Sequence, residues 1–183
     1  MKCSAFIATS LDGYIATNDG QVDWLHSAGN GSKDGGDLGF GAFIDKVDCM
    51  LMGRKTFDTI AAMNLTEEQW PYKETAIWVL SSTLTQRPAS IPVDVNFTSD
   101  DLPELLDNLQ AKGYQHLYAD GGSVITQLIE LKRLDDLCIT MAPILLGSGI
   151  KLFGHLSTPI NLSQASATAF KSDFVQYHCN LSY

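Results

Sequence analysis

Apolar residues in this chain gather in short runs that are separated by longer, more polar stretches. Runs of this length, rich in branched, aromatic and sulfur-containing side chains, are typical of buried β-strands. The runs are CSAFIA (3–8), DCMLM (48–52), TAIWVLS (75–81), HLYA (116–119) and DLCITMA (136–142). They predict a sheet that is covered on both faces.

Segments with helical spacing lie between several of these runs. A helix-like pattern begins after residues 53–56, and residues 37–47 place their apolar side chains near one face, although glycines weaken this second prediction. Residues 101–113 predict a clearer helix, which Asp101 can cap and Gly113 can end, and residues 123–134 predict another. Because strands alternate with helices, we expect right-handed crossovers and a mostly parallel sheet.

The C-terminal third has a different pattern. Residues 159–170 and 174–183 alternate apolar and polar side chains around the turn sequence KSD, which is typical of a β-hairpin. The sequence therefore predicts one α/β domain, residues 1–183, whose mostly parallel central sheet is flanked by helices and carries an antiparallel C-terminal hairpin.

The composition is that of an ordinary globular protein, but the charge is strongly negative. The 183 residues are 45% hydrophobic, and the net charge is −9. A surface of this charge repels phosphate backbones, so we expect no nucleic-acid partner. No segment is long and apolar enough to predict a signal peptide or a membrane span, and the four dispersed cysteines show no metal-ligand spacing. We expect reduced thiols, no bound metal and a cytoplasmic location.

Polar residues that suit phosphate binding follow three of the predicted strands. They are Gly53-Arg54-Lys55-Thr56 after the second run, Ser81 and Ser82 with Thr83 after the third, and Asp120-Gly121-Gly122-Ser123 after the fourth. Backbone amides at a helix start attract anions, and paired glycines allow close approach of a phosphate. Each motif alone is also compatible with an ordinary turn or helix start. Their recurrence at the strand ends of an acidic protein favours a nucleotide held across several strands.

Five segments in order also carry a family resemblance: AFIATSLDGYIA (5–16), MGRKTFDTI (52–60), WVLSSTL (78–84), DGGSVITQLI (120–129) and DDLCITMAPILLGSG (135–149). Nearly the whole chain resembles the dihydrofolate-reductase-like superfamily. It most resembles the C-terminal reductase domain of the bifunctional riboflavin-biosynthesis deaminase/reductase.

This resemblance implies an NADPH site. Arg54 would bind the 2′-phosphate of the adenosine and Thr56 the pyrophosphate, with Gly53 and Lys55 in the same turn. Ser81 and Ser82 would line the adenosine side, and Gly121, Gly122, Ser123 and Val124 would cover the pyrophosphate. The backbone of Ala8 would meet the nicotinamide amide.

Candidate catalytic and substrate-binding residues each have a structural alternative. Asp12 follows the first strand and is a candidate for a polar group near the hydride acceptor, or else it closes an Asx turn at Gly13. Asp37 has a spacing to Gly53 like that of the substrate-binding acid of dihydrofolate reductases, or else it is a helix N-cap. Trp24 and Phe40 either wall a planar substrate or pack in the core.

One segment departs from the riboflavin-type pattern. Those reductases follow the GR-x-T helix with an Asp-Pro-x-Leu-x-x-Arg segment that grips the ribose phosphate of the substrate. Residues 61–78 of this chain contain no arginine, and their one basic residue is Lys73. The usual clamp for a phosphorylated substrate is therefore missing, and no zinc-deaminase signature is present.

The sequence thus predicts an NADPH-dependent reductase resembling 5-amino-6-(5-phosphoribosylamino)uracil reductase, which transfers a hydride to a small heterocyclic or ribosylamino substrate. A dihydrofolate or pterin reductase and a non-catalytic nucleotide-binding protein are the alternatives. Because the alternating C-terminal strand would leave an exposed edge, we also expect a homodimer.

Overall fold

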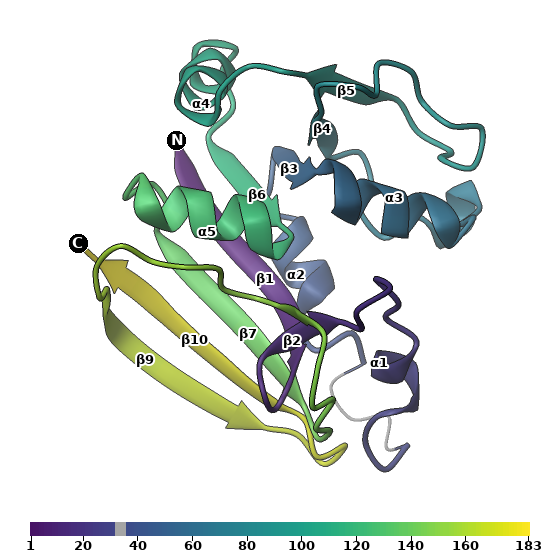
Figure 1. Cartoon of the computed structure of the whole chain (residues 1–183), viewed down its shortest axis with the longest axis vertical. Helices are drawn as coiled ribbons and strands as arrows, with labels where there is room; N and C mark the ends of the chain where they lie inside the picture. The colour runs from purple at the N-terminus through teal and green to yellow at the C-terminus, as the bar shows by residue number, and fades with distance from the viewer. Residues whose placement is uncertain (32–35) are drawn as a thin grey trace.

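The computed structural model describes residues 1–31 and 36–183, and its centre is one large twisted sheet (Figure 1). The sheet has eight strands in the order β5-β4-β3-β6-β1-β7-β10-β9. Their bounds are β1 (Lys2–Ser10), β3 (Cys49–Gly53), β4 (Ala76–Leu80), β5 (Val95–Thr98), β6 (His116–Asp120), β7 (Asp136–Ala142), β9 (Asn161–Ala169) and β10 (Val175–Ser182). The strands from β5 to β7 are parallel, so their carboxyl ends share one edge of the sheet.

Helices cover both faces of this sheet. They are α1 (Trp24–Ser27), α2 (Phe40–Ile44), α3 (Arg54–Ala62), α4 (Leu102–Ala111) and α5 (Gly122–Glu130), with a short 3₁₀ helix, η1 (Glu67–Gln69). The buried residues of α4 and α5 belong to one hydrophobic cluster, and those of α2 and α3 belong to a second. The central strands separate the two clusters.

The strand β3 contributes side chains to both hydrophobic clusters. Cys49 and Leu51 lie in the α4–α5 cluster, whereas Met50 and Met52 lie in the α2–α3 cluster, and all four are at most 1% exposed. Successive side chains of a strand point to opposite faces. A continuous apolar run is therefore required for a strand that is covered on both sides, as the sequence predicts.

The predicted hairpin at the C-terminus is confirmed. β10 pairs antiparallel with β7 on one side and with β9 on the other, and β9 forms the edge of the sheet. A separate two-stranded sheet joins β2 (Tyr14–Ala16) to β8 (Ile150–Lys151). This small sheet ties the segment that follows β1 to the segment that follows β7.

One predicted helix is shorter than expected, and the short elements α1, β2, η1, β5 and β8 were not predicted. The helix predicted over residues 37–47 is confined to Phe40–Ile44, because Leu38 (φ 56°) and Gly39 (φ 87°) adopt left-handed backbone conformations that cannot begin a helix. The strand β5 was missed, since its short segment lies within a stretch rich in proline and polar residues. The helix predicted from Asp101 is confirmed, with Asp101 accepting a hydrogen bond from the amide of Glu104 (3.0 Å).

The four cysteines are buried and form no disulfide, in agreement with the sequence prediction. Burial raises the pKa of Cys49 to about 12, so its thiol stays protonated. Among the residues that the structure describes, no helix has the length and apolar character needed to cross a bilayer.

Candidate functional site

A cavity of about 550 Å³ lies at the carboxyl ends of β3, β4, β5 and β6. We call it the strand-end cavity. It is lined by residues 53–56, 80–82, 98–102, 121, 123, 124 and 127. It therefore brings together most of the residues predicted to bind the cofactor, because parallel strands deliver their following loops to one edge of the sheet.

Two helices begin at this cavity without a capping side chain. Gly53 is the N-cap of α3 and Gly121 is the N-cap of α5, and neither start has a side-chain hydrogen bond. The first amides of each helix consequently remain available as donors. At α4, in contrast, the carboxylate of Asp101 fills this position. Paired uncapped helix starts provide donors and a favourable dipole for an anion.

Arg54 is held at the cavity by two partners. Its Nε donates to both carboxylate oxygens of Asp58 at 2.7 Å, and its Nη1 donates to Thr83 Oγ1 at 3.2 Å. The remaining N–H groups of the guanidinium are free of partners among the described residues. Arg54 is thus oriented before any ligand arrives, with donors left for a phosphate.

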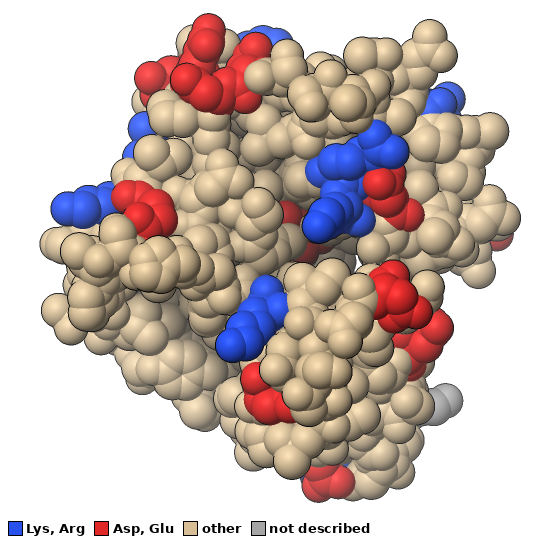
Figure 2. All heavy atoms as spheres, viewed as in Figure 1, with Lys and Arg blue, Asp and Glu red and all other residues tan. Residues whose placement is uncertain are grey.

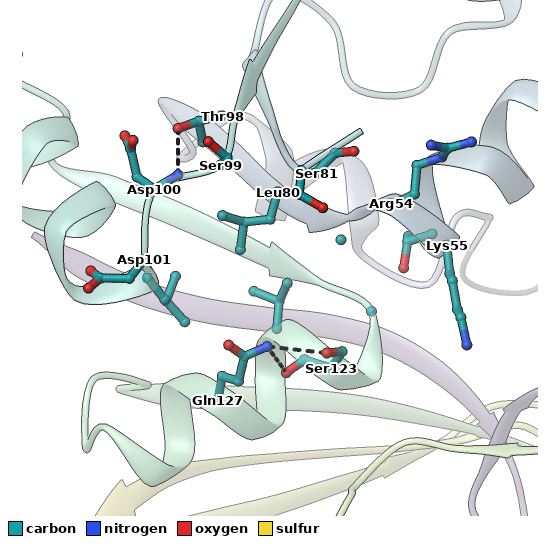
Figure 3. A pocket seen from close by; sticks show the side chains of 16 residues that line it. Arg54, Lys55, Leu80, Ser81, Thr98, Ser99, Asp100, Asp101, Ser123 and Gln127 are labelled. Atoms are coloured by element: carbon teal, nitrogen blue, oxygen red, sulfur yellow. Dashed lines mark hydrogen bonds between the residues drawn. The ribbon is translucent and has the colours of Figure 1, made fainter. Parts of the chain in front are cut away.

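Lys55 and the serines complete the polar wall. The Lys55 side chain extends away from Arg54 (Figure 3). The Ser81 hydroxyl accepts hydrogen bonds from the amides of Thr83 and Leu84, which shapes the turn after β4, and Ser82 lines the cavity beside it. Figure 2 shows Lys and Arg atoms over the start of α3, beside a hollow in this face. The strand-end cavity thus has a cationic end in an acidic protein.

Gly121 and Gly122 are each required to be glycine, for different structural reasons. Gly121 has φ 87°, and a Cβ there would meet Thr56 Oγ1 at 2.1 Å, so only glycine allows the starts of α3 and α5 to approach so closely. A Cβ on Gly122 would meet the carbonyl oxygen of Leu152 at 2.5 Å. Gly122 does not line the cavity, and it is needed for packing against the chain after β8.

A second cavity, of about 640 Å³, lies beside the end of β1. We call it the phenylalanine cavity, since Phe6, Phe40 and Phe174 contribute to its wall. Ala8, Asp37, His26, Thr140 and Ser172 also line it, together with residues 7, 25, 28, 31, 36 and 38. Ala8 is therefore separate from the other predicted cofactor residues, at the position where a second ring could enter.

The predicted substrate residues divide between this cavity and the core. Phe40 lines the cavity, but Trp24 is 9% exposed and packs in a small cluster with Ala142 and Phe174, as its structural alternative proposes. Asp37 lines the cavity while accepting hydrogen bonds from the amides of Gly39 (3.0 Å) and Gly41 (2.5 Å). Its carboxylate thus organises the start of α2 and faces the cavity as well.

Asp12 has partners that favour its structural alternative. Its carboxylate accepts hydrogen bonds from Ser10 Oγ (2.6 Å), the Leu146 amide (3.1 Å) and the Gly147 amide (2.7 Å). The bond from Ser10, supported by the two amides, holds the pKa of Asp12 below its ordinary value. Asp12 lines neither cavity. It clamps the loop after β1 to the loop after β7, and its predicted catalytic role remains a prediction.

Asp120 is a candidate that sequence reasoning grouped only with the glycines beside it. Asp120 ends β6, which lies between β3 and β1 in the sheet, and it lines none of the three cavities itself, although Gly121 beside it lines the strand-end cavity. Burial raises the pKa of its carboxyl to about 6, against the lowering effect of the Gly121 amide. A carboxyl of this kind can hold a proton near neutral pH. The signal in the sequence is an acid that ends an apolar strand.

A third cavity, of about 690 Å³, shares one lining residue with each of the other two. Lys55 lines it together with the strand-end cavity, and His26 lines it together with the phenylalanine cavity. Its wall is completed by residues 18–23, 58, 59, 62, 63, 65 and 150.

The sheet order, the antiparallel C-terminal hairpin and the cavities at the carboxyl ends define a protein of the dihydrofolate-reductase-like fold. Dihydrofolate reductase from Enterococcus faecalis, solved with NADP(H) and RAB-propyl, superposes with a TM-score of 0.61 at 17% identity, covering 100% of this chain and 97% of the reductase. At this identity the likeness concerns the fold alone.

Residues 2–176 match the family model of the RibD C-terminal domain, and the chain belongs to this family. A crystal structure from Shewanella sp. PV-4, of a protein provisionally assigned to riboflavin biosynthesis, has a TM-score of 0.88 and 35% identity over 100% of both chains. The uncharacterized protein YwjB of Bacillus subtilis (strain 168) is 30% identical over 179 residues, which is 97% of this chain and 96% of YwjB.

Proposed function

We propose that this protein is an NADPH-dependent reductase that transfers a hydride to an electrophilic carbon of a small heterocyclic or ribosylamino substrate. The observation that carries the proposal is the pair of uncapped helix starts, α3 and α5, at one cavity with Arg54 and Lys55. Membership of the RibD C-terminal domain family supports it.

The residues of the strand-end cavity fit a dinucleotide phosphate. The close contact of Gly121 with Thr56 leaves the amides of both helices exposed around one concave surface. The starts of α3 and α5 would hold the pyrophosphate, and the free N–H groups of Arg54 would hold the 2′-phosphate. Ala8 would orient the nicotinamide at the phenylalanine cavity. When bound, NADPH would supply the hydride.

Reduction of an imine carbon also requires a proton at the neighbouring nitrogen. Asp120 is our candidate for holding this proton, since burial raises its pKa to about 6 and its neighbour Gly121 lines the strand-end cavity. Asp37 would bind donor groups of the substrate ring at the phenylalanine cavity. The protein thereby separates phosphate binding from substrate binding on neighbouring strands.

A fluorescence titration with NADPH and NADH tests the cofactor assignment directly. We expect NADPH to bind more tightly, because its additional phosphate meets Arg54. Single-turnover oxidation of bound NADPH should then be followed with 5-amino-6-(5-phosphoribosylamino)uracil. The absence of NADPH binding would refute the proposal, whereas binding without turnover on any electrophile would favour the non-catalytic alternative.

A pterin-like substrate is the second candidate, and one observation favours it. Among the described residues that line the phenylalanine cavity there is no lysine or arginine, and Asp37 contributes a carboxylate. An unphosphorylated ring with amino groups suits such a wall better than a phosphate does. Turnover of 7,8-dihydrofolate but not of the phosphorylated aminopyrimidine would support it, and Asp37→Asn should then raise KM for dihydrofolate.

We also propose a homodimer joined through the C-terminal hairpin. The edge strand β9 is exposed over almost its whole length, and residues 161–169 include no charged residue or proline that would block strand pairing. Light scattering should show about twice the chain mass of 19.9 kDa. A 19.9 kDa particle at micromolar concentration would contradict the proposal.

The buried, unbridged cysteines support a reducing compartment such as the cytoplasm.

A further inference from the structure

The strand-end cavity has two chemically different ends. Arg54 and Lys55 lie at one end, where α3 begins, and Asp100 and Asp101 lie at the other, between β5 and α4 (Figure 3). Phosphates would be attracted to the first end and repelled from the second. Given the cofactor of the proposed function, on which this inference rests, its uncharged adenine must therefore occupy the acidic end.

The space between the two ends suits a planar ring. Leu80, Leu102 and Val124 line it, and Val124 is 1% exposed while Leu102 is 5% exposed, so these two side chains are fixed by packing. Apolar side chains of this kind can contact both faces of a base, but they do not distinguish one purine from another. Discrimination requires a polar group at the ring edge.

Gln127 on α5 supplies such a group with a fixed polarity. Its Nε2 donates to the carbonyl oxygen of Ser123 and to Ser123 Oγ, both at 3.2 Å. A backbone carbonyl can only accept hydrogen bonds, so it fixes which end of the amide carries the nitrogen. The Oε1 of Gln127 consequently points away from Ser123 as an acceptor, and it has no partner among the described residues (Figure 3).

The nearby carboxylates are less suited to this role. Asp101 accepts the amide hydrogen of Glu104 as the N-cap of α4. The backbone amide of Asp100 is held by Thr98 Oγ1 (3.1 Å), and its side chain points away from Gln127 in Figure 3. Gln127 is therefore the acceptor that is both oriented and unused.

We propose that Gln127 is a specificity-determining residue that accepts a hydrogen bond from the exocyclic amine of adenine. Hypoxanthine carries an oxygen at this position, which would face Oε1 as a second acceptor. Rotating the amide by 180° would relieve this repulsion only by turning Oε1 against the Ser123 carbonyl. The site should accordingly favour adenine dinucleotides over their deaminated analogues.

The test compares NADPH with its hypoxanthine analogue, nicotinamide hypoxanthine dinucleotide phosphate, by fluorescence titration. Wild-type protein should bind NADPH about tenfold more tightly, the scale of one hydrogen bond that is replaced by an unpaired acceptor. In Gln127→Met the ratio should fall to about one, mainly through weaker NADPH binding. The matched control is Gln110→Met, an exposed glutamine on α4 outside the strand-end cavity, which should keep the wild-type ratio.

Equal affinities in the wild type, or an unchanged ratio in Gln127→Met, would overturn the role of Gln127 and leave the cofactor proposal intact. A wild-type protein that binds neither dinucleotide would refute the proposed function and this inference with it. Melting temperatures of both variants should stay near that of the wild type, since both side chains are exposed and each loses only surface hydrogen bonds, from Gln127 to Ser123 and from the Met1 amino group to Gln110.

Discussion

The strand-end cavity and the phenylalanine cavity are built in different ways. The first is formed by short contiguous motifs, residues 53–56, 80–82 and 98–102, each directly after a strand. The second combines residues 6–8 of β1 and residues around α1 and α2 with one residue of β7 and two near the turn of the C-terminal hairpin, which are far apart in the sequence. The strand-end cavity can therefore be recognised from local sequence motifs, whereas the phenylalanine cavity depends on how the fold brings distant segments together.

The two cavities also differ in how their polar groups are held. Thr56 and Gly121 lie in contact between two helix starts that belong to the sheet core. Asp37 and Leu38, in contrast, lie in an irregular segment, where Gln176 Nε2 donates to the carbonyl oxygen of Leu38 at 2.9 Å. Substitutions in the first cavity should therefore have consequences for the whole domain, and those in the second should act more locally.

The largest expected effect is that of Gly121→Ala. A Cβ would lie 2.1 Å from Thr56 Oγ1 at a residue with φ 87°, so we expect a loss of about 3 kcal/mol or more of unfolding free energy. Gly113→Ala is the matched control, with φ 98° and open space around the added carbon. It should cost only about 1–2 kcal/mol, the backbone contribution.

Urea denaturation measures the unfolding free energy of both variants. The difference between their losses gives the free-energy cost of the clash between the two helix starts. Thr56→Ala in the Gly121→Ala background should recover part of the lost stability, because it removes the clashing hydroxyl. Equal losses in the two glycine variants would mean that the helix starts can move apart freely.

Asp120→Asn should have the next largest effect, because Asp120 is a buried carboxyl at the end of β6, next to the N-cap of α5. If it donates the proton, single-turnover reduction should slow by about 10²-fold. Its pKa is raised to about 6, so the folded state binds a proton that the unfolded state releases at lower pH. Wild-type stability should therefore fall as pH rises from about 4 to 6, by about 3 kcal/mol, and stay low above that range.

The asparagine variant should lack this decline, and the two proteins should be compared by urea denaturation from pH 4 to pH 8. A decline that persists in Asp120→Asn would assign it to another group. A wild-type turnover rate in the variant would exclude Asp120 as the proton donor.

Arg54→Ala should weaken NADPH binding by about 1.5–3 kcal/mol and leave NADH binding nearly unchanged, because only NADPH carries the 2′-phosphate. Arg133→Ala is the control: Arg133 is paired with Asp107 at 3.6 Å and lines none of the three cavities. Fluorescence titration of both variants measures the effect, and an equal loss for NADH and NADPH would show that Arg54 does not distinguish the two cofactors.

Sequence reasoning was most accurate where a few adjacent residues determine the structure. The helix starts at Gly53 and Gly121 were identified because a strand end and a helix start coincide within four residues, and Gly121 also has a left-handed φ of 87°. The hairpin was identified because alternation around KSD leaves little choice of register. Each of these features is local.

The remainder depended on distances that a sequence does not contain. Gln127 lines the strand-end cavity because it lies on the face of α5 that is turned toward the cavity. Asp100 lines it because it follows β5, a strand that the hydrophobic pattern did not predict. Asp120 is buried at the end of β6, a strand that lies between β3 and β1, and this strand order cannot be read from the sequence. The three partners of Asp12 include two amides more than 130 residues away.

The smallest expected effect is that of Asp12→Asn. This variant tests whether the carboxylate of Asp12 takes part in the reaction or only stabilises the loop after β1. The carboxylate accepts hydrogen bonds from Ser10, Leu146 and Gly147, whereas an asparagine would present its NH₂ group to at least one of these donors. The melting temperature should therefore fall. Asp19→Asn is the matched control, since Asp19 also accepts a bond from a hydroxyl two residues earlier, Thr17 Oγ1 (2.5 Å), but contacts no distant amide.

The pH dependence separates the two roles of Asp12. Because its pKa is lowered in the folded protein, its stabilising effect is present above the ordinary pKa and is lost as pH falls through the folded value. The difference in melting temperature between wild type and Asp12→Asn should thus be full at neutral pH and shrink only in strongly acidic solution. A carboxyl that is ionised at neutral pH also cannot donate a proton. We therefore expect single-turnover rates well below the melting temperature to stay within about tenfold of wild type, and a loss of about 10²-fold or more with unchanged melting would restore Asp12 to the chemistry.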